Sequence, residues 1–244
     1  MADIADLYEE VRDDICEVVA GLEPDMLDTP VPATRGWTIK DVVAHVTADA
    51  TCVIAGDFPT GFFEAFGESS AGAQVNAWTA RQIQERQGRS LEELLQEWKN
   101  SGNELASMMR GEKPWPEGLV TFVDRVLLTD ATVHQQDILG ALGIERARES
   151  APVKVGLSGY IATMGWRLAA ASIPPLKFDL GDKTYTAGDA EPGATVRASR
   201  FELFRAMSGR RNPEQVRAYE WDGDPEPYIH YFYPYGPRND SLIE

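Results

Sequence analysis

The stretch LLTDATVHQQDIL, residues 127–139, places one aspartate four positions before a histidine and another aspartate three positions after it. Residues three and four apart share one face of an α-helix, so Asp130, His134 and Asp137 project together. Leucine, valine and isoleucine residues on the flanks give the same helix apolar surface for packing. The stretch therefore predicts a packed helix, from about residue 119 to 142, that carries a polar line.

A second histidine lies on a comparable helix earlier in the chain. The sequence GWTIKDVVAHV, residues 36–46, offers Thr38 as an N-cap and Asp41 at the third helical position, which is close to a capping box. His45 follows within VVAHV, and Asp41 and Asp49 lie one turn to either side of it. This pattern predicts a helix whose single histidine shares its face with carboxylates.

If these two helices are neighbours, the core of a bundle receives His45 from one and Asp130 with His134 from the other. Two imidazoles and a carboxylate leave a fourth coordination position open, as in catalytic zinc-type sites. An Asp-x-x-x-His pair on a helix is nevertheless common, and most such pairs are local hydrogen bonds or solvent-facing charges. The spacing alone leaves both interpretations open.

The rest of the first half also predicts helices. Apolar residues recur at three- and four-residue steps from Ile4 until Gly21 ends the helix, and a capping box opens another helix over 91–109. A shorter helix is expected over 74–87, and 56–72 has the composition of a long loop. Four long helices with these connections suit an antiparallel bundle.

The second half has a mixed pattern. It predicts a helix over 152–171, a hairpin over 176–187 that turns at Gly181 and Asp182, a strand over 193–199, a short helix over 200–209 and aromatic-rich strands over 217–224 and 227–236. We therefore expect an α+β protein, with a helical bundle over residues 1–148 and a small α/β domain over residues 149–244.

Composition excludes some classes of function. The net charge is −16, and no basic stripe is present that could neutralise nucleic-acid phosphates. No apolar run approaches the roughly 20 residues that span a bilayer, and the acidic N-terminus lacks the cationic start of a secretory signal. We expect a cytoplasmic protein without nucleic-acid or membrane partners. Cys16 and Cys52 lie among apolar residues, which favours buried reduced thiols over nucleophiles.

Three motifs carry a resemblance to a known family. The sequence WTIKDVVAHV (37–46), the pattern D-x-x-V-H-x-Q-D-I (130–138) and the run MSGRRNPEQVRAYEWDGD (207–224) are similar to the mycothiol-dependent maleylpyruvate isomerase family. That family belongs to the wider DinB-like group of metal-binding four-helix bundles. The resemblance implies a DinB-like antiparallel four-helix bundle followed by a small α/β domain similar to sterol carrier proteins.

By the same resemblance, His45, Asp130 and His134 take the positions of three ligands to a divalent metal ion, for which zinc is expected. The family's best-known enzyme has glutamate where this chain has Asp130, and aspartate is shorter by one methylene group. Asp137 then has a catalytic supporting role, orienting His134 or a bound water. Arg210 is implied as a catalytic and cofactor-binding residue that recognises an anionic substrate or thiol, because arginine suits carboxylates.

Two functions follow. The first is a metal-dependent enzyme in which mycothiol, a low-molecular-weight thiol, isomerises or is conjugated to a small electrophilic substrate, with the metal holding the thiol as thiolate. The alternative is a non-catalytic protein on the same fold that binds a metal or a small ligand. We expect a monomer or a homodimer in either case.

Overall fold

The computed structural model describes residues 3–58, 69–119, 122–234 and 236–244, and these ranges confirm the α+β class. The chain divides into two compact units. The first contains described residues 3–58, 73–119, 122–147 and 244, and the second contains residues 69–72, 148–234 and 236–243. Within the described ranges, no helix is both long and apolar enough to cross a membrane.

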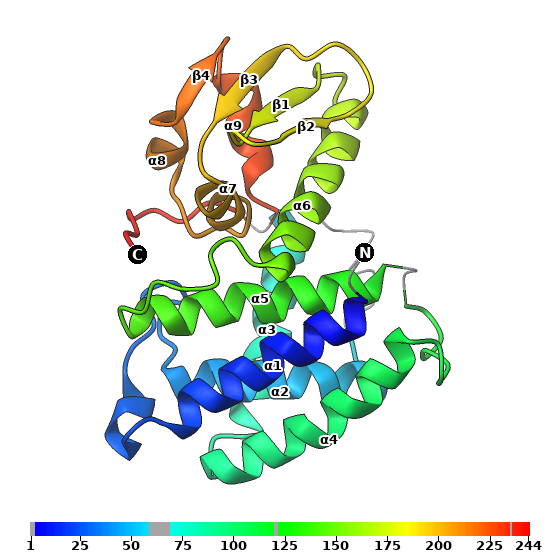
Figure 1. The fold of residues 1–244 in the computed structure, drawn as a ribbon, viewed down its shortest axis with the longest axis vertical. Helices are drawn as coiled ribbons and strands as arrows, with labels where there is room; N and C mark the ends of the chain where they lie inside the picture. Colours follow the sequence, from blue (N-terminus) through cyan, green and yellow to red (C-terminus); the bar gives the residue numbers. More distant parts are fainter. Residues whose placement is uncertain (1–2, 59–68, 120–121, 235) are drawn as a thin grey trace. The chain divides into compact units, whose positions relative to one another are not determined.

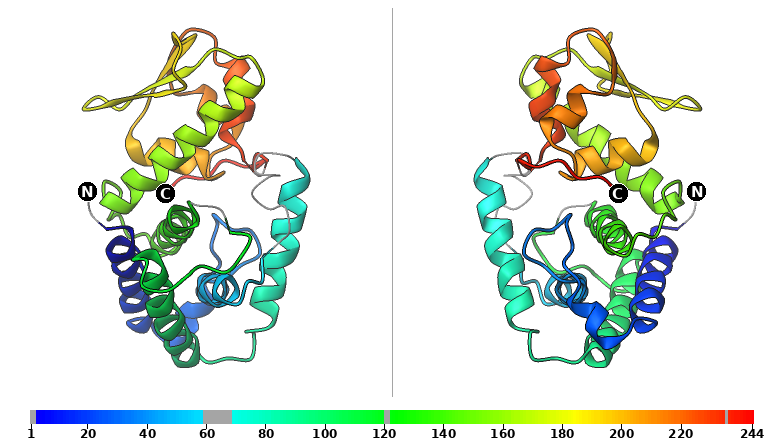
Figure 2. Two further views of the ribbon diagram at one scale, coloured as in Figure 1. Left: turned by 90° about the vertical axis from the view of Figure 1, so that its right-hand side faces the viewer. Right: turned by 90° about the vertical axis from the view of Figure 1, so that its left-hand side faces the viewer.

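The first unit is a four-helix bundle (Figure 1). Its four long helices are α1 Ile4–Ala20, α2 Ile39–Ile54, α4 Leu91–Met109 and α5 Val123–Ala141. Both α1 and α2 pack against α4 and α5, which closes the bundle around one core. A 3₁₀ helix, η1 Pro24–Asp28, contacts α2. A further helix, α3 Ser69–Gln84, runs across the direction of the bundle helices (Figure 2).

Capping boxes fix the residues at which α2 and α4 begin. The predicted capping box of α2 is confirmed, because the Thr38 side chain accepts from the backbone N–H of Asp41 while the Asp41 carboxylate accepts from that of Thr38. The predicted box of Ser90 and Glu93 at the start of α4 is confirmed in the same way. Each box satisfies backbone donors that the first helical turn leaves unpaired.

Two predicted boundaries were wrong in part. The helix expected from residue 119 begins at Val123, with residues 120–121 outside the described ranges. The loop expected over 56–72 ends earlier, because α3 already begins at Ser69, and 59–68 lie outside the described residues. The small residues at the start of α3 resemble a loop in composition, yet none of them prevents a helix.

The bundle core joins α1 to α4 through an aromatic pair. Trp98 on α4 is fully buried, and its indole N–H donates to the hydroxyl of Tyr8 on α1 at 3.0 Å. The buried indole is therefore not left with an unsatisfied donor. Burial and this hydrogen bond fix how the two helices pack.

The second unit contains a four-stranded sheet. Its strands are β1 Leu176–Asp179, β2 Thr184–Ala187, β3 Ala194–Arg197 and β4 Glu220–Asp222, in the order β2-β1-β3-β4. The predicted hairpin is confirmed: β1 and β2 pair antiparallel, and the turn places Gly181 at φ 85°, a conformation that favours glycine. The strand predicted over 193–199 is confirmed as β3, which pairs parallel with β1.

Helices complete this unit. The predicted helix over 152–171 is confirmed as α6 Ala151–Ala170, which packs against β2 and α7 Arg200–Met207. A short helix, α8 Pro213–Arg217, precedes β4.

The strand predicted over 227–236 was wrong. Its described residues form α9 Glu226–Ile229 and the 3₁₀ helix η2 His230–Phe232. Two features at the start of α9 favour a helix despite the aromatic residues. The Asp224 carboxylate accepts from the backbone N–H of Glu226, and Pro227 lies in the first turn.

Candidate metal centre

The two histidine-bearing helices are neighbours in the bundle, which meets the condition that a shared site required. Packing of α2 against α5 brings together His45 from α2 and both Asp130 and His134 from α5. One ligand atom from each residue lies within 4.8 Å of the other two. Among the described residues, these three form the one cluster of histidine, cysteine or acidic side chains with a geometry that could hold a metal ion.

The donor atoms are arranged around the Asp130 carboxylate. The Nε2 atom of His45 lies 3.5 Å from Oδ2 of Asp130, and the Nε2 atom of His134 lies 3.8 Å from Oδ1. These separations are long for direct hydrogen bonds. They are close to the ~3.3 Å that separates neighbouring donors on a tetrahedral ion with bonds of ~2.0 Å. The spacing suits three ligands of one metal ion.

A glutamine that the sequence analysis missed lies behind His45. The Nε2 atom of Gln82 on α3 donates to the Asp49 carboxylate at 2.8 Å, which turns its Oε1 atom toward Nδ1 of His45 at 2.9 Å. Because an amide oxygen only accepts, Nδ1 of His45 must carry the hydrogen. Nε2 is the nitrogen that faces Asp130, and in the neutral form of the ring it carries the lone pair.

Asp137 lies beside the Nδ1 atom of the second histidine. Its fully buried carboxylate is 3.0 Å from Nδ1 of His134. The two atoms are close enough for an electrostatic contact, but they are not aligned as in a good hydrogen bond. Each histidine therefore has a polar group at Nδ1, which leaves both Nε2 atoms directed toward Asp130.

Trp37 forms an aromatic wall beside both imidazoles. Its ring is stacked with that of His134, with centroids 5.9 Å apart, and meets the edge of His45 with centroids 5.2 Å apart. The two histidine rings are 4.8 Å apart and nearly perpendicular. Trp37 immediately precedes the N-cap of α2, a position from which sequence reasoning could suggest a packing role but not this contact.

The cluster has one accessible side. The side chains of His45 and His134 are buried, whereas that of Asp130 is 37% exposed. Asp130 is therefore the most exposed of the three side chains. Accessibility on one side is what an open coordination position requires.

The charges in the cluster shift several pKa values. Burial lowers the pKa of His45, but the carboxylates of Asp49 and Asp130 outweigh it and raise that pKa to about 9. Burial lowers the pKa of His134 despite its acidic neighbours. Burial also raises the pKa of Asp49, to about 7, whereas the two histidines hold the pKa of Asp130 well below its usual range against the effect of burial.

Arg210, the remaining predicted site residue, belongs to the second unit. It is half-buried, and its Nη1 atom donates to the carbonyl of Ser208 at 2.6 Å. Its neighbour Arg211 is buried and makes a bidentate ion pair with Glu202 at 2.7 Å for each nitrogen. The Arg211 guanidinium therefore binds a carboxylate of the protein itself.

The fold is similar to two solved structures of isomerases. One is a crystal structure of a mutant of the mycothiol-dependent maleylpyruvate isomerase in which alanine replaces a histidine, and it matches with a TM-score of 0.56 and 12% identity over 90% of this chain and 91% of that chain. Another is the "Crystal structure of the mycothiol-dependent maleylpyruvate isomerase", with a TM-score of 0.51 and 15% identity over 85% of this chain and 88% of that chain. At such identities the likeness concerns the fold. No curated protein matches the sequence.

A family model gives the sequence relationship. The model described as "Mycothiol maleylpyruvate isomerase N-terminal domain" matches residues 8–139, which is more than half of the chain and includes the whole candidate metal centre. The resemblance carried by the histidine motifs is confirmed by this match. The chain belongs to the mycothiol maleylpyruvate isomerase N-terminal domain family.

Proposed function

We propose that this protein is a metal-dependent enzyme that uses a low-molecular-weight thiol, mycothiol, to isomerise or conjugate a small electrophilic substrate. The observation that carries the proposal is the convergence of His45, Asp130 and His134, with the Nδ1 atom of each histidine facing another polar side chain. Family membership supports mycothiol as the thiol. Maleylpyruvate is the first substrate to test, because the two similar structures are maleylpyruvate isomerases.

The residues fit a divalent ion by their chemistry. Two imidazole nitrogens and one carboxylate oxygen are ligands that suit zinc, and three protein ligands leave a position for a further one. Gln82 and Asp137 orient the imidazoles, as groups behind metal-binding histidines commonly do. When bound, such an ion supplies the positive charge that favours a thiolate over a thiol at neutral pH.

The protein's own cysteines are poor nucleophiles, which fits the use of an external thiol. Burial raises the pKa of Cys16 to about 11 and also raises that of Cys52. Both side chains are therefore protonated near neutral pH, and the thiolate is the reactive form. Neither cysteine is a member of the metal cluster.

We propose Arg210 as the residue that binds an anionic group of the substrate or of the thiol. It is preferred to Arg211 because Arg211 is buried against Glu202. On this proposal Arg210→Ala raises KM more than it lowers kcat, since the lost interaction is present before the reaction as well as during it.

The test measures metal-dependent turnover with and without mycothiol. The purified, metal-loaded protein is given maleylpyruvate and then a panel of small electrophiles, and both isomerised and thiol-conjugated products are followed. Turnover that needs both metal and mycothiol supports the enzyme. A protein that binds metal tightly but leaves every electrophile unchanged with mycothiol present is instead a non-catalytic binding protein.

A further inference from the structure

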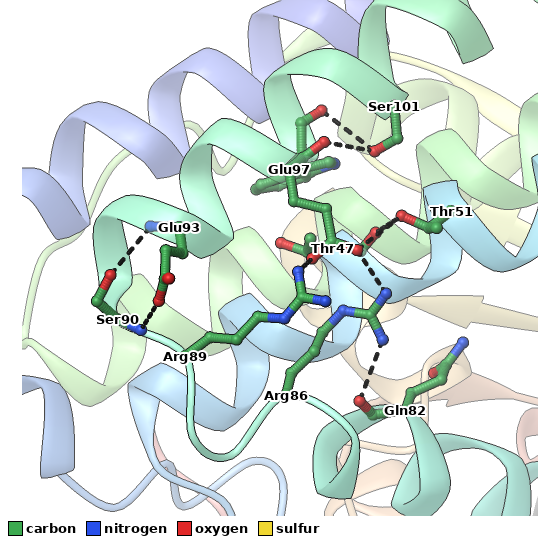
Figure 3. Close-up of polar contacts among 10 residues, drawn as sticks. Thr47, Thr51, Gln82, Arg86, Arg89, Ser90, Glu93, Glu97 and Ser101 are labelled. Atoms are coloured by element: carbon green, nitrogen blue, oxygen red, sulfur yellow. Dashed lines mark hydrogen bonds and ion pairs between the residues drawn. The ribbon is translucent and has the colours of Figure 1, made fainter.

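A second polar cluster lies away from the metal ligands, at Glu97 on α4. Figure 3 shows its carboxylate facing donors from two other segments. Oε1 accepts from the Thr51 hydroxyl of α2 at 3.0 Å and from Nη2 of Arg86 at 2.6 Å, and Oε2 accepts from Nη1 of Arg89. Arg86 and Arg89 lie in the segment that follows α3. Glu97 therefore ties this segment to α2 and α4.

The Arg86–Glu97 pair within this cluster is largely removed from water, whereas Arg89 is exposed. The side chain of Arg86 is 6% exposed and that of Glu97 is 16% exposed. An ion pair with so little exposure holds its partners more firmly than a surface pair, because neither charge can be left without its counterpart. The segment after α3 is thus fixed at Arg86.

The cluster connects to the metal centre through Gln82. Nη1 of Arg86 donates to the backbone carbonyl of Gln82 at 3.3 Å, and both appear in Figure 3. The side chain of the same glutamine accepts from His45 and donates to Asp49. The contacts therefore run from Glu97 through Arg86 and Gln82 to a proposed metal ligand.

We propose that Gln82 is a positioning residue for the metal centre and that the Arg86–Glu97 ion pair holds it in place. This inference rests on the proposed function, since it assigns the residue that directs His45 toward the metal. The backbone of Gln82 is fixed from one side by Arg86, and its amide is fixed from the other by Asp49. The His45 ring is then held with Nε2 toward Asp130.

The hydrogen bonds required at position 82 explain why the residue there is a glutamine. The side chain must accept from an imidazole N–H and donate to a carboxylate at the same time, and a primary amide does both. Glutamate offers no hydrogen to Asp49 when ionised and would place a second negative charge beside it. Methionine has a similar length and flexibility but makes neither hydrogen bond.

The first test compares two glutamines of the same helix. We expect Gln82→Met to weaken zinc affinity by roughly 10- to 100-fold, the usual loss when a group behind a metal-binding histidine is removed. Gln84→Met is the matched control, because Gln84 is exposed and close to Gln82 in sequence. The zinc affinity of the Gln84→Met protein should equal that of the unchanged protein. Equal affinities for all three proteins would overturn the proposal.

A spectroscopic measurement separates positioning from loss of structure. In zinc-loaded protein labelled with ¹⁵N-histidine, the Nδ1–H of His45 should give a signal protected from solvent exchange, and Gln82→Met should lose that protection while Nδ1–H of His134 is unaffected. A protected His45 signal that persists in Gln82→Met would contradict the role of Gln82.

The second test asks whether the ion pair acts through Gln82. Arg86→Lys keeps the charge beside Glu97 but removes the fork that reaches both Glu97 and the Gln82 carbonyl. We expect Arg86→Lys alone to lower zinc affinity. When Arg86→Lys is added to Gln82→Met, we expect no further loss of zinc affinity. Equal losses in both backgrounds would show that the pair does not act through Gln82. Glu97→Gln provides a second variant for the same cycle.

The two proposals fail in different ways. If the unchanged protein binds no metal, the proposed function and the positioning role of Gln82 both fail. If the unchanged protein and Gln82→Met bind zinc equally well, the metal centre stands and the positioning role fails.

Discussion

Nε2 of His45 on α2 lies 3.5 Å from Oδ2 of Asp130 on α5, while Nδ1 of the same ring lies 2.9 Å from Gln82. The ring is thus bonded on the side away from Asp130 and only loosely contacted on the side that faces it. Nε2 of His45 and a carboxylate oxygen of Asp130 therefore converge on one point, and the imidazole lone pair becomes available when the ring loses its proton.

The carboxylates of α5 should differ in importance. Asp130→Ala removes a proposed ligand and should abolish tight metal binding, whereas Asp137→Ala should cost roughly 10- to 100-fold because Asp137 only orients His134. Metal titration against a chelator of known affinity measures both. A larger loss from Asp137→Ala than from Asp130→Ala would reverse the assignment of the two roles.

Metal affinity should rise with pH above neutrality. The pKa of His45 is raised to about 9, so metal must displace a proton from this ring at lower pH. His134 has a lowered pKa and is already neutral near pH 7. We expect affinity to increase about tenfold per pH unit between about pH 7 and pH 9, with one proton released. A flat profile over this range would mean that metal does not compete for the His45 proton.

The stability of the metal-stripped protein should change in the opposite direction. The folded pKa of His45, about 9, lies above its ordinary value of 6.5, so the folded state binds more protons between these values. The stabilisation is complete below about pH 6.5 and is lost as pH rises through about 9, with a magnitude on the order of 3 kcal/mol. Urea unfolding at several pH values measures it, and His45→Gln should flatten this part of the profile. A stability that rises between about pH 6.5 and pH 9 would contradict the shift.

Trp37 should report metal binding. Its ring lies against both histidine rings, so cobalt bound to them should quench its fluorescence. Among the six tryptophans of the chain, Trp37→Phe should remove most of the cobalt-dependent quenching. Trp166→Phe is the control, because Trp166 is 64% exposed and belongs to the second unit. Quenching that survives Trp37→Phe but disappears in Trp166→Phe would place the metal elsewhere.

Local features of the fold could be predicted because they depend on neighbours in the sequence. The capping boxes at Thr38 and Ser90 identified helix starts, and Gly181 identified the hairpin turn. Non-local pairing could not be predicted in this way. Nothing within β1 or β3 specifies that they pair in parallel, since the register depends on the elements that pack around them.

Aromatic content misled the prediction near the C-terminus. Tyrosine and phenylalanine favour strands, yet the buried residue Phe232 lies three positions after Ile229 and four after Tyr228, which is a helical pattern. The proline-rich start of α9 favours a helix as well. Together these two signals could have identified the helical segment.

The candidate site was predictable only where its residues share a helix. The three-, four- and seven-residue spacing of Asp130, His134 and Asp137 follows from helix geometry, and the family motif pointed to His45. Gln82 lies on a different helix, and its contact with His45 depends on how α3 packs against α2. A single glutamine on an amphipathic helix carries no local signal for such a role.

The most direct test of the central claim is the metal content of protein purified without added metal or chelator. We predict about one divalent ion per chain for the unchanged protein and for His230→Ala, whose exposed histidine lies in the second unit. His134→Ala should lose the ion while its far-ultraviolet circular dichroism remains helical. A His134→Ala protein that retains a full equivalent of metal would contradict the assignment of the centre.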